Sequence, residues 1–163
     1  MPLTPQLLLE ALDTLNISYE LHSHAPLHTV EESRQLRGKI SGGHCKNLFL
    51  KDKKGVLWLV VCLEDVQVDM KTLNSKIGSA RLSFGKPELM LEVLGVTPGS
   101  VTPLALINDE SVRVNIILDA KMMAHKKLNY HPLTNEQTVT ISSENLLVFI
   151  KSCGHRVQIV DIG

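Results

Sequence analysis

This chain of 163 residues contains few aromatic residues and no excess of either charge. Only 4% of the residues are Phe, Trp or Tyr, and 17 Lys and Arg balance 17 Asp and Glu. A hydrophobic share of 44% still supports a core, built mainly from Leu, Val and Ile. The neutral balance gives no chain-wide attraction to nucleic acid. We expect one compact domain, residues 1–163, with a single core.

Cysteine is also sparse. Cys45, Cys62 and Cys153 form no CxxC pair, which excludes a disulfide scaffold and predicts a reducing compartment. No apolar stretch approaches membrane-spanning length, and the start of the chain lacks the basic segment and apolar run of a signal peptide. We therefore expect a cytoplasmic protein with no membrane contact. Walker, GxGxxG, GxSxG and HExxH motifs are all missing.

Capping residues and apolar periodicity predict a mixture of helices and strands. Thr4 and Pro5 are typical of the start of a helix that ends near Asn16, and Thr29-Val30-Glu31-Glu32 is a capping box for a short helix that stops at Gly38. Further helices are predicted over residues 70–76, 87–94 and 145–153. Strands are predicted over residues 17–22, 47–51, 56–63, 112–118 and 157–162.

The order of these elements predicts the fold class. Helices and strands mix without a regular βαβ repeat, and the turn Asp52-Lys53-Lys54-Gly55 joins two of the strands into a hairpin. This pattern favours an α/β (α+β) fold over a doubly wound one. We expect a mixed, largely antiparallel sheet with helices packed outside.

One segment carries a local excess of positive charge. Residues 46–86 contain eight basic residues against four acidic ones, although the whole chain is neutral. Such a segment suits a protein that contacts a polyanion with one face. A solvated face with scattered lysines remains the alternative.

A polar cluster follows two glycines in Gly42-Gly43-His44-Cys45-Lys46-Asn47. A lysine at the start of the next strand can point its ammonium into a cleft, where it could hold a phosphate or stabilise an oxyanion without a metal. An exposed solubilising lysine is the alternative. His44 and Cys45 are neighbours on a strand and point to opposite faces, so a buried, inert Cys45 is favoured over a thiol nucleophile.

Three further features are candidates for chemistry. His22 and His24 have the spacing that places two imidazoles on one strand face, but with His28 they make an incomplete zinc site. The loop Gly95–Pro103 is rich in Gly and Pro, which preorganise backbone N–H donors. His131 precedes a rigid proline and is a candidate pocket residue. Hydrogen-bonding histidines and a plain connecting turn are the alternatives.

Together these motifs resemble the YbaK and prolyl-tRNA synthetase associated editing family. The resemblance is carried in chain order by four segments: His24-Ala25-Pro26 with Thr29–Glu32, His44–Asp52, Gly99–Pro103 and His131–Asn135. It covers nearly the whole chain. The run Lys46–Asp52 with His131-Pro132-Leu133-Thr134-Asn135 is most similar to the stand-alone alanyl-tRNA(Pro) deacylases called ProXp-ala or PrdX.

The resemblance implies a barrel-like sheet and metal-independent, cofactor-free hydrolysis of an aminoacyl-tRNA ester. Lys46 falls on the family's essential lysine, and Asn47 on the polar residue after it. Substrate contacts are implied for the backbone of the family's GxxxP loop and for His131; the loop comprises Gly99, Ser100, Val101, Thr102 and Pro103. Lys51, Lys53 and Lys54 are the candidate tRNA-binding residues. The expected partners are the acceptor end of tRNA(Pro) and prolyl-tRNA synthetase.

A mechanism follows as a hypothesis. Lys46 holds the terminal adenosine by its phosphate or the ester oxygen, loop N–H groups face the developing oxyanion, and Asn47 or His131 orients a water. A pocket near Leu27, Val30 and Ile107, too small for proline, selects alanine by size. The alternatives are a YbaK-type deacylase of Cys-tRNA(Pro), a non-catalytic tRNA- or synthetase-binding module and, more distantly, a zinc hydrolase.

Overall fold

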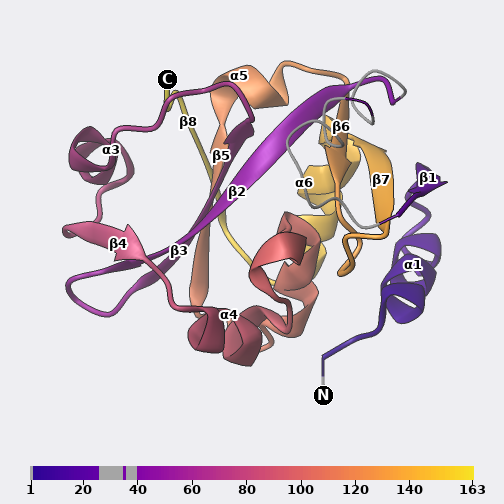
Figure 1. The fold of residues 1–163 in the computed structure, drawn as a ribbon, viewed down its shortest axis with the longest axis horizontal. Helices are drawn as coiled ribbons and strands as arrows, with labels where there is room; N and C mark the ends of the chain where they lie inside the picture. Colours follow the sequence, from indigo (N-terminus) through magenta and orange to yellow (C-terminus); the bar gives the residue numbers. More distant parts are fainter. Residues whose placement is uncertain (1, 26–34, 36–39) are drawn as a thin grey trace.

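The computed structural model of the chain describes residues 2–25, 35 and 40–163, and Figure 1 traces the other residues in grey. The predicted capping box Thr29–Glu32 and the helix stop at Gly38 lie outside the described residues. So do Leu27, His28 and Val30.

An eight-stranded sheet forms the centre of the molecule (Figure 1). Its strand order is β1-β7-β6-β2-β3-β5-β8, with β4 paired to β2. Four pairings are antiparallel (β1–β7, β6–β7, β2–β3, β2–β4) and three are parallel (β2–β6, β3–β5, β5–β8), so the predicted mixed α/β class is confirmed. The strands are β1 (Tyr19–Ser23), β2 (Gly43–Asp52), β3 (Leu57–Leu63), β4 (Leu82–Phe84), β5 (Val114–Asp119), β6 (Lys127–Tyr130), β7 (Gln137–Ser142) and β8 (Val157–Val160).

Helices surround the sheet and begin and end at the residues that local signals select. The Thr4 hydroxyl accepts the Leu7 N–H at the start of α1, Ser142 caps α6, and Gly95 ends α4 in the left-handed conformation with φ 68°. The helices are α1 (Pro5–Thr14), α3 (Met70–Ile77), α4 (Pro87–Leu94), α5 (Ala120–Met123) and α6 (Ser143–Ser152), with 3-10 helices η1 (Pro98–Ser100) and η2 (Pro103–Asn108). None of the helices in the described ranges has the length and apolarity needed to cross a membrane.

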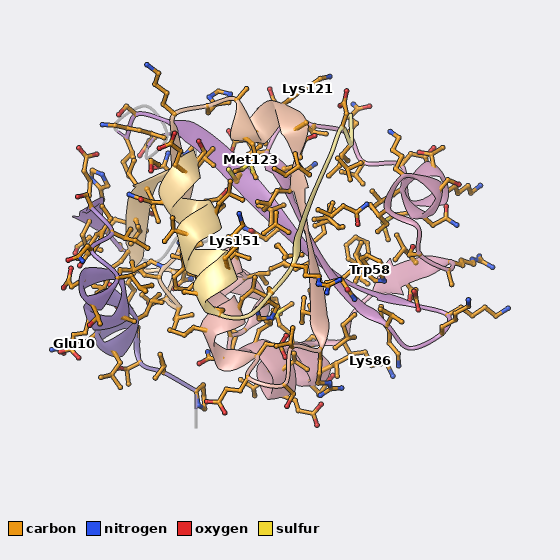
Figure 2. All side chains as sticks on the ribbon, turned by 180° about the vertical axis from the view of Figure 1, so that it is seen from behind. Glu10, Trp58, Lys86, Lys121, Met123 and Lys151 are labelled. Atoms are coloured by element: carbon orange, nitrogen blue, oxygen red, sulfur yellow. The ribbon has the colours of Figure 1, made fainter. Side chains whose placement is uncertain are left out.

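The buried residues divide into two cores, one on each face of the sheet, where the composition alone suggested one. The larger core packs α1, α4, η2 and α6 against the strands, with Leu12, Leu94, Leu104 and Phe149 among its residues. Figure 2 shows α6 lying across the strands on this side. The smaller core contains side chains of β2 and β3 together with Leu73 and Ile77 of α3 and Leu82 of β4.

Several element boundaries differ from those predicted. Strand β2 begins at Gly43, so Lys46 lies inside the strand and not at its mouth; the first residues, Gly43 and His44, pair with β6, which is distant in sequence. Strand β5 begins at Val114 because Val112 lies in a turn with φ 53°. Strands β4 and β7 were not predicted.

Candidate functional site

Lys46 and Asn47 are consecutive in β2, and the pleat sends their side chains to opposite faces of the sheet. Lys46 lies opposite Cys62 of β3, which belongs to the smaller core. Asn47 lies opposite Val61, which belongs to the larger core. The side chains of the two predicted catalytic residues therefore lie on different faces of the sheet.

The Lys46 side chain is half-buried, and its ammonium donates a hydrogen bond to the Val66 carbonyl in the segment that follows β3. The amine does not point into open solvent. It also does not face the Gly99–Pro103 loop, because Val101 of that loop packs in the larger core on the other face. This corrects the expected geometry, in which amine and loop lie side by side; the register of β2 on β3 decides it.

Asn47 carries a buried polar atom, its side-chain oxygen. Its Oδ1 is inaccessible to solvent and accepts no hydrogen bond from any described residue. On the same face of β2, Cys45 and Phe49 flank it and pack with the larger core. A buried acceptor without a donor costs about 1–3 kcal/mol, so such atoms in a folded protein point to a binding or catalytic role.

The Cys45 thiol is in an environment that makes it unreactive. Burial raises the pKa of its thiol to about 12, although hydrogen bonds with Tyr130 and the Asn129 backbone act in the opposite direction. A thiol with so high a pKa carries almost no thiolate at neutral pH. The interpretation of Cys45 as a buried, inert residue agrees with this environment.

The Gly99–Pro103 loop spans the end of η1, the two connecting residues Val101 and Thr102, and the first residue of η2. Gly99 is exposed, and the next four residues are buried. The Ser100 N–H is already donated to the Thr97 carbonyl at 2.9 Å, and the Thr102 hydroxyl accepts the Leu104 N–H. Within the described part of the chain, no hydrogen bond engages the N–H groups of Val101 and Thr102. These two are the loop donors that remain free for a ligand.

The turn that follows β6 adjoins this loop. A Cβ atom built on Gly99 would lie 3.6 Å from the Asn135 amide nitrogen. His131 begins the same turn, where its Nδ1 lies 3.0 Å from the Gln137 carbonyl. Its ring centroid is 6.5 Å from that of His24. The structure thus brings the predicted loop and the His131–Asn135 segment together on one side of the molecule.

His131 is held as a neutral ring. Burial lowers its pKa below 6.5, the nearby His24 lowers it further, and the hydrogen bond to Gln137 raises it only in part. A neutral imidazole with Nδ1 bonded to a carbonyl leaves Nε2 as an acceptor. That nitrogen can orient a water or a hydroxyl.

The zinc alternative gains no ligand set from the structure. Nδ1 of His24 is 2.9 Å from the Ala25 carbonyl, and its Nε2 is 2.9 Å from the Thr138 hydroxyl. Both ring nitrogens are therefore in use. Across residues 2–25, 35 and 40–163, no group of three or more His, Cys, Asp or Glu side chains could hold a metal ion. His28 lies outside the described residues.

Two of the three predicted tRNA-binding lysines line a surface groove of about 630 Å³. Lys51 and Lys53 lie on its β2 side, and Lys86 lies at the start of α4 and is labelled in Figure 2. Phe84 of β4 adds an aromatic ring that is 65% exposed. Lys54 is exposed in the adjoining turn. Phe84 was not predicted to bind RNA, and Lys86 was counted only among the basic residues of the segment 46–86.

The acidic residues of the groove are partly neutralised. Asp52 is buried and its carboxylate accepts the Trp58 indole N–H at 3.2 Å as well as backbone N–H groups. Glu92 forms an ion pair with Arg113 at 3.3 Å. Glu88 also lines the groove. Three exposed lysines therefore share the groove with two exposed carboxylates, Glu88 and Glu92.

Ile107, a residue guessed to lie near the selective pocket, lines a different cavity of about 280 Å³ beside Leu3 and Gly95. This cavity is closed on one side by the start of the chain, where the Leu3 N–H is donated to the Asn108 side chain at 2.9 Å. The pocket-lining guess for Ile107 is not supported by this placement.

Comparison with known proteins agrees with the motifs. Residues 24–149 match the family model of the aminoacyl-tRNA editing domain. The chain is 35% identical over 158 residues to the prolyl-tRNA editing protein ProX of Acetoanaerobium sticklandii, covering 96% of each chain. It is 39% identical over 151 residues to prolyl-tRNA synthetase associated domain-containing protein 1 of Mus musculus, covering 90% of this chain and 89% of that one.

The fold has a counterpart among solved structures. A candidate trans-editing enzyme for prolyl tRNA synthetase superposes with a TM-score of 0.71 at 20% identity, over 98% of this chain and 97% of the other. The expected resemblance is confirmed: this chain belongs to the aminoacyl-tRNA editing domain family.

Proposed function

We propose that the protein is an aminoacyl-tRNA deacylase that acts in trans and hydrolyses alanine wrongly attached to tRNA(Pro). The observation that carries the proposal is the buried Oδ1 of Asn47, which has no hydrogen-bond partner among the described residues and lies on the face of the sheet that packs against the Gly99–Pro103 loop. Family membership supplies the reaction class, and the name of the ProX relative supports proline tRNA as the substrate carrier. The catalytic unit spans residues 1–163 as one domain and works in the cytoplasm.

The chemistry requires a water, an oxyanion site and a leaving hydroxyl. Water attacks the ester carbonyl carbon, the bond from that carbon to the ribose oxygen breaks, and free alanine and a 3′-terminal hydroxyl result. The neighbouring ribose hydroxyl carries the proton from the water to the leaving oxygen. In this mechanism Asn47 Oδ1 accepts a hydrogen bond from the water or the ribose, and His131 Nε2 orients the same water.

The Gly99–Pro103 loop stabilises the negative charge that develops on the carbonyl oxygen. The N–H groups of Val101 and Thr102 donate no hydrogen bond within the described part of the chain, and they lie in a buried, short turn whose conformation Pro103 fixes. Positioning and charge stabilisation suffice for an aminoacyl ester, because correct orientation alone can supply about 7–11 kcal/mol of the barrier. The reaction in this form uses no cofactor or metal.

Lys46 binds phosphate in this proposal and does not touch the ester oxygen. Its ammonium lies on the face opposite the loop, so in this mechanism it binds the phosphate of the terminal nucleotide. The ammonium has three donors, of which the Val66 carbonyl uses one. Among the described residues no acceptor engages the other two, which bind phosphate oxygens in this mechanism.

The groove of Lys51, Lys53, Lys86 and Phe84 receives the RNA behind the aminoacylated end. Lys51 is five residues along β2 from Lys46, which places it about 16 Å away at the rise of a strand. A stacked strand advances about 3.4 Å per nucleotide, so the groove is within reach of the same acceptor end. Prolyl-tRNA synthetase is the partner expected to release the mischarged substrate.

Amino acid selection by size completes the proposal. A proline-activating site cannot strongly reject alanine, since each missing methylene is worth only about 1–3 kcal/mol. A second pocket that excludes proline corrects this error. Incubating the protein separately with alanyl-tRNA(Pro) and cysteinyl-tRNA(Pro) tests the assignment. Faster loss of the alanyl ester supports it; faster loss of the cysteinyl ester favours the YbaK-type activity, and unchanged half-lives of both favour a non-catalytic binding module.

A further inference from the structure

A buried carboxylate on the same face of the sheet as Lys46 has a role that the deacylase mechanism does not explain. Asp119 ends β5 and is 0% exposed. Its position beside Cys62 is evident from the register of β3 on β5, in which Leu118 pairs with Val61. Lys46, Cys62 and Asp119 therefore form one row across three neighbouring strands, at the end of the smaller core.

Asp119 does not perform the function expected from its position. It is the N-cap residue of α5, yet its side chain makes no capping hydrogen bond. Instead Oδ1 accepts the backbone N–H of Ile162 at 3.0 Å. Oδ2 is buried without a partner in the described part of the chain. A fully buried carboxylate is costly, so one retained for a single backbone contact indicates that the contact matters.

A chain of contacts links Ile162 to Lys46 through Gly163 and Val66. The Lys76 ammonium of α3 donates to the Ile162 carbonyl at 2.7 Å, so Ile162 is held from both sides. The next residue, Gly163, lies so near Val66 that a Cβ atom on it would be 3.0 Å from Val66 Cγ1. The carbonyl of that same Val66 accepts the hydrogen bond from the Lys46 ammonium.

We propose that Asp119 is a positioning residue for Lys46, acting through Ile162, Gly163 and Val66. Asp119 and Lys76 hold the Ile162–Gly163 segment against Val66, and this fixes the carbonyl that orients the Lys46 ammonium toward the substrate phosphate. Without this support the Val66 segment moves, and the ammonium loses its preset direction. The inference rests on the proposed function, since it serves the phosphate contact of Lys46.

The first test is a double-mutant cycle on alanyl-tRNA(Pro) hydrolysis by the full chain, with Asp119→Ala, Lys46→Met and the pair. Asp119→Ala is expected to raise KM by about 10-fold with little change in kcat. In the Lys46→Met background it is expected to have no further effect, because coupled residues are not additive. Asp119→Asn keeps an oxygen acceptor for the Ile162 N–H and is expected to restore most of the activity.

A milder variant covers the case in which Asp119→Ala does not fold. Lys76→Met removes the ammonium that holds Ile162 and is expected to raise KM in the same direction, again only when Lys46 is present. Lys71→Met is the matched control, since Lys71 is an exposed lysine on the same helix whose side chain makes no contact with Ile162 or Gly163 in the described structure. Thermal unfolding of each variant separates loss of fold from loss of positioning.

Equal losses from Asp119→Ala, or from Lys76→Met, in the wild-type and Lys46→Met backgrounds would overturn the proposal. An unchanged KM in folded Asp119→Ala would do the same. If Asp119→Asn lost as much activity as Asp119→Ala, the negative charge of Asp119 would be what matters. The proposed support of Ile162 by an oxygen acceptor would then be wrong. Failure of the proposed function is distinguishable from these outcomes, because the wild-type protein would then leave the ester intact.

Discussion

Asn47 and Lys46 are adjacent in β2 but lie on opposite faces of the sheet, Asn47 beside Val61 and Lys46 beside Cys62. The proposed mechanism uses both faces. It places the aminoacyl ester on the side of the Gly99–Pro103 loop and the phosphate on the side of Val66.

Replacing Asn47 with Leu should reduce activity without reducing stability. Its buried Oδ1 accepts no hydrogen bond within the described structure, so the free energy of unfolding should change by less than about 1 kcal/mol, while kcat falls by about 100-fold. Asn129→Leu is the control. The Asn129 amide donates to the Ser41 carbonyl at 3.0 Å and accepts the Thr140 hydroxyl at 2.6 Å, so this variant should be clearly destabilised. Urea unfolding and ester hydrolysis measure both; equal destabilisation would contradict the role given to Asn47.

His131 should titrate below pH 6.5. Burial is the main cause of the lowered pKa and His24 contributes, so the ring is neutral at pH 7 and gains its proton only as the pH falls below its usual value. The proton that the ring gains at low pH binds Nε2, the nitrogen that orients the water. The kcat should therefore be constant above pH 6.5 and decline below it. Replacing His24 with Gln should move the His131 midpoint upward. NMR titration of the imidazole signals measures this, and a wild-type midpoint above 6.5 would refute it.

The Asp109–His155 pair should make stability sensitive to acid. Burial raises the pKa of Asp109, but hydrogen bonds from His155, Arg113 and Val114 outweigh it and hold the pKa below 3.8. A depressed carboxyl pKa stabilises the fold above the unfolded value and ceases to do so as the pH falls through the folded value. This contribution should therefore begin to fall as the pH drops below about 3.8 and be lost once the pH is below the folded pKa.

Urea unfolding between pH 3 and pH 6 checks this linkage. Asp109→Asn should flatten the pH dependence and lower stability at pH 6, since it weakens the 2.9 Å contact with His155. Asp161→Asn is the matched control because Asp161 is exposed and lies 3.9 Å from Lys121. An unaltered pH slope in Asp109→Asn would contradict the assignment.

Lysines of the groove should contribute to RNA affinity through phosphate contacts. Single replacement of Lys51, Lys53 or Lys86 by Met should lower the slope of log affinity against log salt by about 0.7–1. Phe84→Ala should weaken binding by about 1–3 kcal/mol at any salt, through lost stacking. Lys151→Met on α6, labelled in Figure 2 and remote from the groove, should leave the slope unchanged. Identical slopes for all lysine variants would exclude the groove.

Local signals in the sequence account for the parts of the fold that were predicted well. Pro87 and Gly95 bound α4 at the expected residues, and Ser142 opens α6 as a cap. Strands β4 and β7 were missed because they depend on partners far along the chain, such as Tyr19 opposite Ile141. A strand of this kind is stabilised by its cross-strand pairs more than by its own residues.

The candidate site shows the same division. The family resemblance, together with the local motifs, pointed to Lys46, Asn47, the Gly99–Pro103 loop and His131, and the structure brings the loop and the His131 turn together. The face occupied by Lys46 could not be predicted, because a register shift of one residue would reverse it. Asp119 was not identified at all: a single buried Asp at a strand end has no sequence motif.

The discrimination between alanyl-tRNA(Pro) and correctly charged prolyl-tRNA(Pro) tests the proposed function most directly. Both esters are incubated with wild-type protein, and the first-order rate of amino acid release is measured. We predict that the alanyl ester is hydrolysed at least about 100-fold faster, since a pocket that fits alanine excludes the larger proline side chain. Equal rates for the two esters, or rates no higher than without protein, would contradict the account.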